Sequence, residues 1–362
     1  MPSVQDGPIS PLFVPLPFRG NVTLSELPGV GPSEEMSAAL EHAPSGDCVA
    51  WGIPFAIGDV VVIRDDAVSL ELGPTQAGWL VFMHTSDLRP VEPGPGGFIS
   101  PMRGQGQLAE HAADYVIRYA DGTEKRASIR RRHQIGAFQR GWGENCFEAV
   151  AHHKQRPLRA AHEQLNPDWG RTQTRGTAAD NGPWVNWLWA WQNPHPGKAI
   201  VGVRFEPVSG LVVVSAVSAG DASSLPLRWQ PRRKACLTLP PGETFLPEMD
   251  DHGLLQQIRL DLGQVISAAP RAIYPKETWE ETYNNQVPER SENEVLVEYT
   301  AHPDACFHLS DGQVIPVQSV AEEGTRGLAQ PLTFVPPATQ RVTLRAVERD
   351  SGRPVPVKLH VH

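Results

Sequence analysis

Four tryptophans lie within eight consecutive residues of this chain, and their spacing limits how that segment can fold. The octet WVNWLWAW ends in three indoles, Trp187, Trp189 and Trp191, which alternate with Leu188 and Ala190. In a β-strand, residues two positions apart point to the same face. The three rings would therefore share one face and the smaller apolar side chains the other. Because both faces are apolar, the pattern predicts a strand buried between two packed layers.

Three roles are open for these rings. The pattern favours a core of aromatic side chains, since each ring can bury about 150–250 Å². A second role is a platform for sugar binding, in which an exposed indole face meets the C–H face of a pyranose. A third is a cofactor site, which lacks support because no phosphate-binding loop accompanies the rings. Trp142, Trp169 and Trp184 lie in irregular segments and are the indoles that we expect to be exposed.

Composition predicts β-structure beyond this segment. The chain of 362 residues contains 32 glycines and 35 prolines, more than the average usage of roughly 7% and 5%. That excess favours many turns and few long helices, as in an all-β protein. The net charge of −9 argues against a nucleic-acid partner. Apolar runs are far shorter than the roughly 20 residues that cross a bilayer. No secretory signal is visible at the N-terminus, so we expect a cytoplasmic protein with no membrane partner.

Local patterns predict individual elements. The run DYVIRYADGTEKRASIRR alternates, turns at Asp121 and Gly122, and returns, which indicates a β-hairpin. The segment Gly78–Thr85 is apolar on both faces and should be a central strand. A short helix is expected over Ser33–Ala43, with Ser33 as its N-cap. Further strands are expected at Asp59–Asp65, Ala67–Leu72, Ala199–Pro207, Gly210–Gly220 and, closing this set, Lys234–Pro240.

Four parts are predicted along the chain. They are an N-terminal arm (1–46), a main β-sandwich (47–240), a connecting segment (241–292) and a smaller β-sandwich-like domain (293–362). Within the connecting segment, 248–268 is open between a strand pair and a helix. The small domain should contain strands over 293–317 and a hairpin over 342–361, and because the last strand runs to the final residue we expect that domain to be truncated.

Several segments carry a family resemblance. The stretches YVIRYADGTEKRASI, GWLVFMHTSD and WLWAWQNPHPGKAIVGVRFEP resemble galactose-binding-like jelly-roll domains, over roughly Cys48–Leu239. The C-terminal VTLRAVERDSGRPVPVKLHVH is similar to the start of carboxypeptidase-regulatory-like, transthyretin-like β-domains. This order resembles the N-terminal half of some bacterial metallohydrolases of the PHP superfamily. The metal-bearing half would be absent here, so no activity carries over.

The resemblance implies a non-catalytic role: binding of carbohydrate or of a partner, as an accessory to a hydrolase domain or subunit. A ligand would bind at loop tips on one end of the sandwich. The residues expected to bind it are Trp142, Trp169, Trp184, His195 and Asp221. A module with a purely structural role in an assembly, in which every tryptophan is core and no pocket forms, stays open.

An enzymatic alternative rests on the region 141–182. If that region is helical, Glu144, Glu148 and His152 recur every four residues on one face, and His162 lies nearby in sequence. These four are the catalytic candidates for a glycan-active or metal-dependent hydrolase, because glycoside hydrolysis needs two carboxylates that flank the scissile bond.

Metal and cofactor signals are sparse. We expect no cofactor, and the four cysteines form no CxxC pair that would indicate a zinc site. His360 and His362 have the spacing of metal ligands, but Lys358 and Leu359 precede the first histidine where an acidic partner would stand, so a plain strand is favoured. The acidic segment MDDHG, 249–253, is interpreted as a turn or as a structural calcium site.

Overall fold

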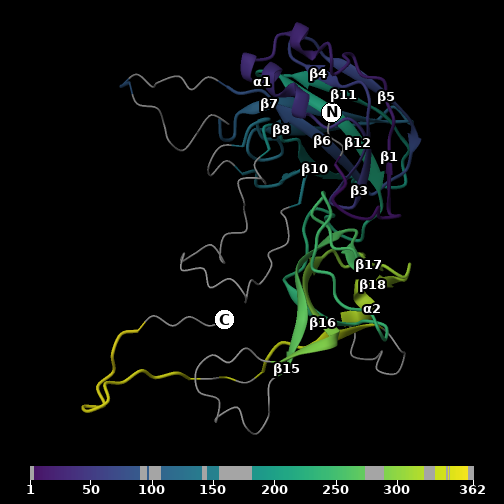
Figure 1. Cartoon of the computed structure of the whole chain (residues 1–362). Coiled ribbons are helices and arrows are strands. Elements are labelled where there is room, and N and C mark those ends of the chain that lie inside the picture. The colour runs from purple at the N-terminus through teal and green to yellow at the C-terminus, as the bar shows by residue number, and fades with distance from the viewer. Residues whose placement is uncertain are drawn as a thin grey trace.

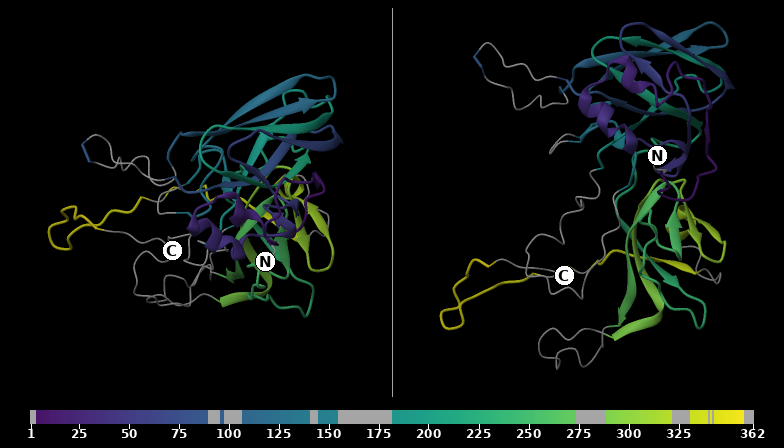
Figure 2. Two further views of the ribbon diagram at one scale, coloured as in Figure 1. Left: turned by 90° about the horizontal axis from the view of Figure 1, so that it is seen from above. Right: turned by 45° about the horizontal axis from the view of Figure 1, so that its top comes forward.

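The computed structural model describes residues 4–89, 96–97, 107–140, 145–154, 182–273, 289–321, 331–339, 341 and 343–357. In these ranges the chain is built mainly of antiparallel strands, which confirms the all-β prediction. Two β modules lie one above the other in Figure 1 and in the right view of Figure 2. The short helices of the described residues are α1 (Glu34–Ala39), α2 (Val317–Ala321) and the 3₁₀ turns Leu27–Val30 and Leu40–His42.

The first module is a sandwich of two sheets. One sheet has the strand order β1 (Phe13–Pro15), β12 (Val212–Gly220), β6 (Trp79–Ser86), β10 (Trp187–Gln192) and β9 (Val150–Ala151), with β4 (Val61–Ile63) also paired to β12. The other has the order β5 (Val68–Thr75), β11 (Ile200–Pro207), β7 (His111–Tyr119) and β8 (Glu124–Arg130). Buried side chains between these sheets form an inner core around Phe82, Trp189 and Phe205.

The tryptophan segment is a buried strand, as predicted. Strand β10 pairs antiparallel with the central strand β6, and every residue of β6 is buried. Trp187 and Trp189, only 3% and 6% exposed, belong to the inner core, whereas Leu188 belongs to the core on the opposite face of the sheet. A Cβ at Gly136 would stand 2.2 Å from the Trp187 ring. The indole is therefore accommodated only because that position lacks a side chain.

Two further local predictions are confirmed. The β7–β8 hairpin turns at Asp121 and Gly122, where the glycine has φ 83° and the carboxylate accepts the Thr123 N–H at 3.0 Å. Helix α1 begins after Ser33, whose hydroxyl oxygen accepts the Met36 N–H at 3.0 Å as an N-cap. The strand expected over Ala67–Leu72 runs further than predicted, since β5 continues through Gly73 and Pro74 to Thr75.

The second module consists of two smaller sheets. The first has the order β15 (Gly263–Ile273), β16 (Glu289–Ala301), β13 (Arg233–Thr238) and β19 (Leu332–Val335). The second has the order β14 (Ile258–Leu260), β17 (Cys306–Leu309) and β18 (Val314–Pro316). The segment 248–268, for which a helix and a strand pair were both considered, contains β14 and the start of β15. Strand β13 does not close the main sandwich as expected; it pairs with β16 and β19 instead.

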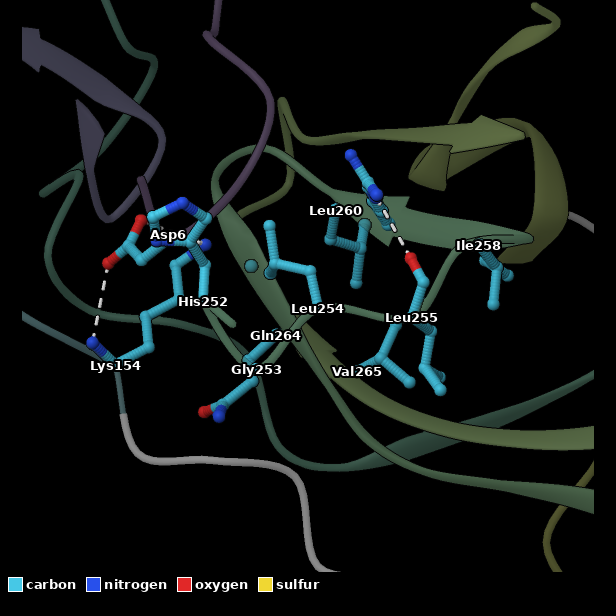
Figure 3. A pocket seen from close by; sticks show the side chains of 12 residues that line it. Asp6, Lys154, His252, Gly253, Leu254, Leu255, Ile258, Leu260, Gln264 and Val265 are labelled. Carbon is cyan, nitrogen blue, oxygen red and sulfur yellow. Dashed lines mark hydrogen bonds and ion pairs between the residues drawn. The ribbon is translucent and has the colours of Figure 1, made fainter. Parts of the chain in front are cut away.

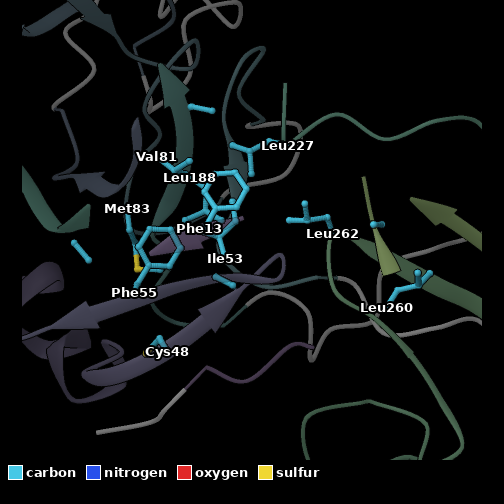
Figure 4. Packing of buried hydrophobic residues seen from close by; sticks show 14 of the residues in the cluster. Phe13, Cys48, Ile53, Phe55, Val81, Met83, Leu188, Leu227, Leu260 and Leu262 are labelled. Carbon is cyan, nitrogen blue, oxygen red and sulfur yellow. The ribbon is translucent and has the colours of Figure 1, made fainter. Parts of the chain in front are cut away.

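A second core joins the modules. It covers the outer face of the β6–β10–β12 sheet and includes residues of the β2–β3 hairpin (Gly46–Ala50 and Ile53–Ile57). From Phe55 and Met83 this junction core continues to Leu260 and Leu262 of the second module (Figure 4). The apolar contact between the modules is therefore continuous with the interior of the first.

The C-terminal segment 343–357 extends away from both modules (Figure 1). Within the stretch where a hairpin was expected, it turns at 349–351, and one isolated bridge joins Val347 to Pro354. Its apolar side chains Leu344 and Val357 are exposed. Within the described residues it pairs with no other strand. His360 and His362 lie outside the described residues.

Candidate functional site

A cleft of about 280 Å³ opens beside β9, where the two modules meet. Its wall from the first module includes Trp51 and the β9 residues, and β15 of the second module contributes Gln264. The polar side chains that line it are Arg140, Asn145, His153, Lys154 and Gln264. Carboxylates are absent from its lining among the described residues.

Trp51 is fixed in an unusual backbone conformation at the tip of the β2–β3 hairpin. Its φ of 59° lies in the left-handed region, which costs a bulky residue on the order of 1–3 kcal/mol. Two hydrogen bonds hold it there: its N–H donates to Asp6 Oδ2 and its Nε1–H donates to the Ala151 carbonyl, both at 2.8 Å. The next residue must be glycine, because a Cβ at Gly52 would stand 2.2 Å from the Asp261 carbonyl oxygen.

The Trp51 ring is half-buried and leans on a second indole. Its centroid lies 4.4 Å from that of Trp229, with 39° between the planes. Trp229 lies on the segment that enters the second module. The Lys154 ammonium lies 5.7 Å from the centroid of the Trp229 ring. One side of the cleft is thus a rigid aromatic pair, and the ring nearer the cleft keeps part of its surface exposed.

A buried ion pair lies behind this wall. Lys154 Nζ is 3.7 Å from Asp6 Oδ1 (Figure 3). The same ammonium donates to the Asp261 carbonyl at 3.1 Å. The other carboxylate oxygen of Asp6 accepts the backbone N–H groups of Trp51 and Lys154. Burial raises the pKa of Asp6 and lowers the pKa of Lys154, in each case because it disfavours the charged form.

This ion pair connects three parts of the chain. Asp6 belongs to the N-terminal arm, Lys154 follows β9, and Asp261 belongs to the second module. A smaller cavity of about 40 Å³ lies on the far side of Lys154, lined by Asp6, Lys154 and Leu260 among others (Figure 3). The position of the Lys154 side chain therefore depends on how the two modules pack.

Of the four predicted catalytic residues, the two that the structure describes, Glu148 and His152, do not line this cleft. The described segment 145–154 is not helical, because Val150 and Ala151 pair with β10, so the condition for a shared helix face is not met there. Glu148 is exposed. Glu144 and His162 lie outside the described residues.

His152 itself has a structural environment. The ring Nδ1 of His152 accepts the backbone N–H of Asn186 at 3.1 Å. The backbone N–H of His152 donates to the Asn186 carbonyl at 2.8 Å. Burial lowers the pKa of His152 to about 3, since the charged imidazolium would be desolvated. A neutral, buried imidazole bonded to backbone in this way holds β9 beside β10.

The predicted ligand residues divide between two places. Trp184 is only 3% exposed and donates from Nε1 to Asn186 Oδ1 at 3.1 Å, so its expected exposure is wrong. His195 and Asp221 lie at one loop end. There Asp221 accepts the Gly78 N–H, and the Gly78 carbonyl accepts the N–H of Asn193, whose side chain accepts the His195 N–H.

These loop-end residues do not contribute to the cleft lining. Trp142 and Trp169, the other indoles expected at a ligand site, lie outside the described residues.

A serine, a histidine and an aspartate also meet in the second module. The Ser224 hydroxyl is 2.8 Å from His302 Nε2, and Asp304 Oδ2 is 3.6 Å from His302 Nδ1. However, Nδ1 accepts the backbone N–H of Asp304 at 3.1 Å, which places the ring proton on Nε2. In a Ser-His-Asp triad the carboxylate accepts a hydrogen bond from Nδ1–H, and the unprotonated Nε2 acts as the base. The tautomer here is the opposite one, so His302 donates to the serine and does not activate it.

Metal ligands do not gather in the described part of the chain, where no group of three His, Cys, Asp or Glu side chains could hold an ion. In the acidic segment 249–253, Asp250 Oδ1 accepts the N–H groups of His252 and Leu254, and Oδ2 lies 3.4 Å from Arg259. These contacts are those of a turn. The structural calcium ion stays a prediction.

In comparisons with known proteins, no family model, curated protein or solved structure matches the chain. Among the described helices, none has the length and apolar character needed to cross a membrane.

The sequence patterns did not indicate the cleft residues. One signal was present: Trp51 and Gly52 separate two apolar runs, CVA and IPFAI, and so mark a hairpin turn. Arg140, Lys154 and Gln264 carry no such signal, because they come from distant parts of the chain and meet only through module packing.

Proposed function

We propose that this chain is a non-catalytic carbohydrate-binding β-sandwich protein, accessory to a hydrolase, and that the cleft beside β9 is its binding site. The observation that carries the proposal is the half-buried Trp51 ring, held by hydrogen bonds at the edge of a cleft lined with hydrogen-bonding side chains. A flat indole face suits the C–H face of a pyranose, and the polar groups around it suit the hydroxyls.

The lining favours binding over hydrolysis. The amides of Asn145 and Gln264 can each donate and accept, as sugar hydroxyls require, and Arg140 adds donors. Hydrolysis of a glycoside needs a pair of carboxylates on either side of the bond. The described residues of the cleft supply none.

Rigidity supports the same role. The Trp51 side chain is fixed by its bond to Ala151 and its contact with Trp229 before any ligand arrives. A preorganised ring loses little conformational entropy on binding, so more of the contact energy is available as affinity.

The accessory role rests on two supports. One is the resemblance of the sequence segments to modules found beside hydrolases. The other is the C-terminal segment, where Leu344, Val347 and Val357 are each exposed. Exposed apolar side chains on one short segment are suited to contact with another protein, here a hydrolase domain or subunit.

Trp51 provides the test. Binding of the full chain to immobilised oligosaccharides should be weakened at least tenfold by Trp51→Ala and less by Trp51→Phe, which keeps an aromatic face. Trp191→Ala is the matched control, because that indole is also partly exposed but lies outside the cleft. Unchanged binding by Trp51→Ala, or cleavage of a bound sugar by the purified chain, would contradict the proposal.

A further inference from the structure

We infer that the cleft selects acidic saccharides, sugars that carry a carboxylate, and that Arg140 binds the acid group. This inference rests on the proposed function and names its ligand class. It follows from the balance of charge around the cleft, taken one side chain at a time.

The charged side chains that line the cleft are cationic. Arg140 and Lys154 carry positive charge, and the remaining polar side chains are those of His153 and two amides. The described residues place no carboxylate in the lining to oppose these charges. An anion that enters the cleft therefore meets these donors and cations, and no carboxylate among the described lining residues opposes it.

Lys154 does not account for this preference. Its ammonium is already paired with the buried Asp6 carboxylate and bonded to the Asp261 carbonyl. The pair contributes a net charge near zero at the cleft. Lys154 thus belongs to the wall, and the charge available to a ligand must come from another residue.

Arg140 supplies that charge. Its Nη2 donates to the amide oxygen of Asn145, which is a neutral partner. A guanidinium has five N–H donors in a planar fork, which matches the two oxygens of a carboxylate. The contact with Asn145 uses one donor and orients the group, so the rest of the fork is available to a carboxylate on a sugar ring.

The size of the cleft restricts the ligand to a short segment. At about 280 Å³ it is smaller than most small-molecule sites, which measure roughly 300–1,000 Å³. We therefore place one sugar ring on Trp51 with its carboxylate at Arg140, and further rings outside the cleft.

The experiment compares matched ligands by calorimetric titration of the full chain. Trigalacturonate should bind at least tenfold more tightly than its fully methyl-esterified form, which has the same rings but no charge. Arg140→Gln should remove most of this difference by weakening trigalacturonate binding alone. Arg349→Gln, an exposed arginine of the C-terminal segment, is the control and should change neither affinity.

The outcomes separate the two proposals. Equal affinity for the acid and the ester would overturn the acidic preference and leave carbohydrate binding in place. Binding of O-sulfated galactotriose without binding of trigalacturonate would overturn the assignment of a carboxylate. If Arg140→Gln keeps the full preference for trigalacturonate over its ester, the assignment of Arg140 as the residue that binds the carboxylate is overturned. Failure of every saccharide to bind would overturn the proposed function itself. Circular dichroism of each variant confirms that the fold is kept.

Discussion

The Trp51 indole packs against the Trp229 indole at 4.4 Å between centroids, and the two rings come from opposite sides of the module junction. Trp51 lies in the turn at the tip of the β2–β3 hairpin of the first module. Trp229 precedes β13, and its neighbour Gln230 donates from its N–H to the Ala301 carbonyl of the second. The aromatic wall of the cleft is therefore formed only when the modules are packed, so the stability of the junction and binding at the cleft should change together.

Trp229 should affect binding although it does not line the cleft. Trp229→Ala removes the surface against which Trp51 rests, and we expect it to destabilise the chain by about 2 kcal/mol, less than a fully buried tryptophan would. Saccharide affinity should fall with it, because Trp51 loses its fixed orientation. Urea denaturation and calorimetric titration measure the two effects; a loss of stability with unchanged affinity would contradict the link.

The buried ion pair should show strong coupling. Lys154→Met leaves the Asp6 carboxylate buried without its cation, a change that costs about 3–5 kcal/mol. Adding Asp6→Asn removes that charge but keeps an oxygen for the Trp51 N–H, so the double variant should be more stable than Lys154→Met alone. Unfolding free energies from urea denaturation test this cycle. Simple additivity of the two single changes would show that the pair does not interact.

Acid should destabilise the first module through His84. This imidazole is fully buried; Nε2 donates to the Gln134 carbonyl, and Nδ1 accepts from the Tyr115 hydroxyl. Burial lowers the pKa of His84 to about 4. Below about pH 6.5 the His84 imidazole binds a proton in the unfolded chain but stays neutral in the folded chain, where its pKa is about 4. The free energy of unfolding therefore decreases as the pH falls from about 6.5 towards 4. The loss at pH 5 is about 2 kcal/mol.

A variant isolates this contribution. His84→Gln keeps a side chain that can donate and accept but does not titrate, and its unfolding free energy should depend less steeply on pH between 7 and 4. An identical slope in the parent chain and the variant would exclude His84 as a source of the acid sensitivity.

Gly136 should tolerate no side chain. The Cβ of Gly136→Ala would lie 2.2 Å from the Trp187 ring, so either the ring or the strand must move, and overpacking of this kind costs about 1–3 kcal/mol or more. Gly58→Ala is the matched control, because no atom lies within 4 Å of its Cβ. The melting temperature should fall for the first variant and stay nearly constant for the second. Equal melting temperatures would contradict the packing described here.

The parts of the fold that could be predicted are those specified locally. Alternation identified β10, a two-sided apolar run identified β6, and the Asp-Gly turn identified the β7–β8 hairpin. Each of these signals lies within one short stretch of sequence. The partner of β13 could not be predicted in this way, because strand pairing over a long separation depends on the assembled modules.

The candidate site was less predictable for the same reason. Trp184 was expected to be exposed because its segment is irregular, yet Phe138 and Asn186 cover it. Irregular backbone does not imply an exposed side chain. The cleft itself combines Trp51, Arg140 and Gln264, which meet across the module junction and leave no common pattern in the sequence.

A crystal structure of the full chain grown with trigalacturonate tests the central claim most directly. We predict electron density for a sugar ring against the exposed face of Trp51, with its carboxylate within hydrogen-bond distance of the Arg140 guanidinium. Density at the loop end beside His195 and Asp221, with the cleft beside β9 occupied only by solvent, would contradict the account.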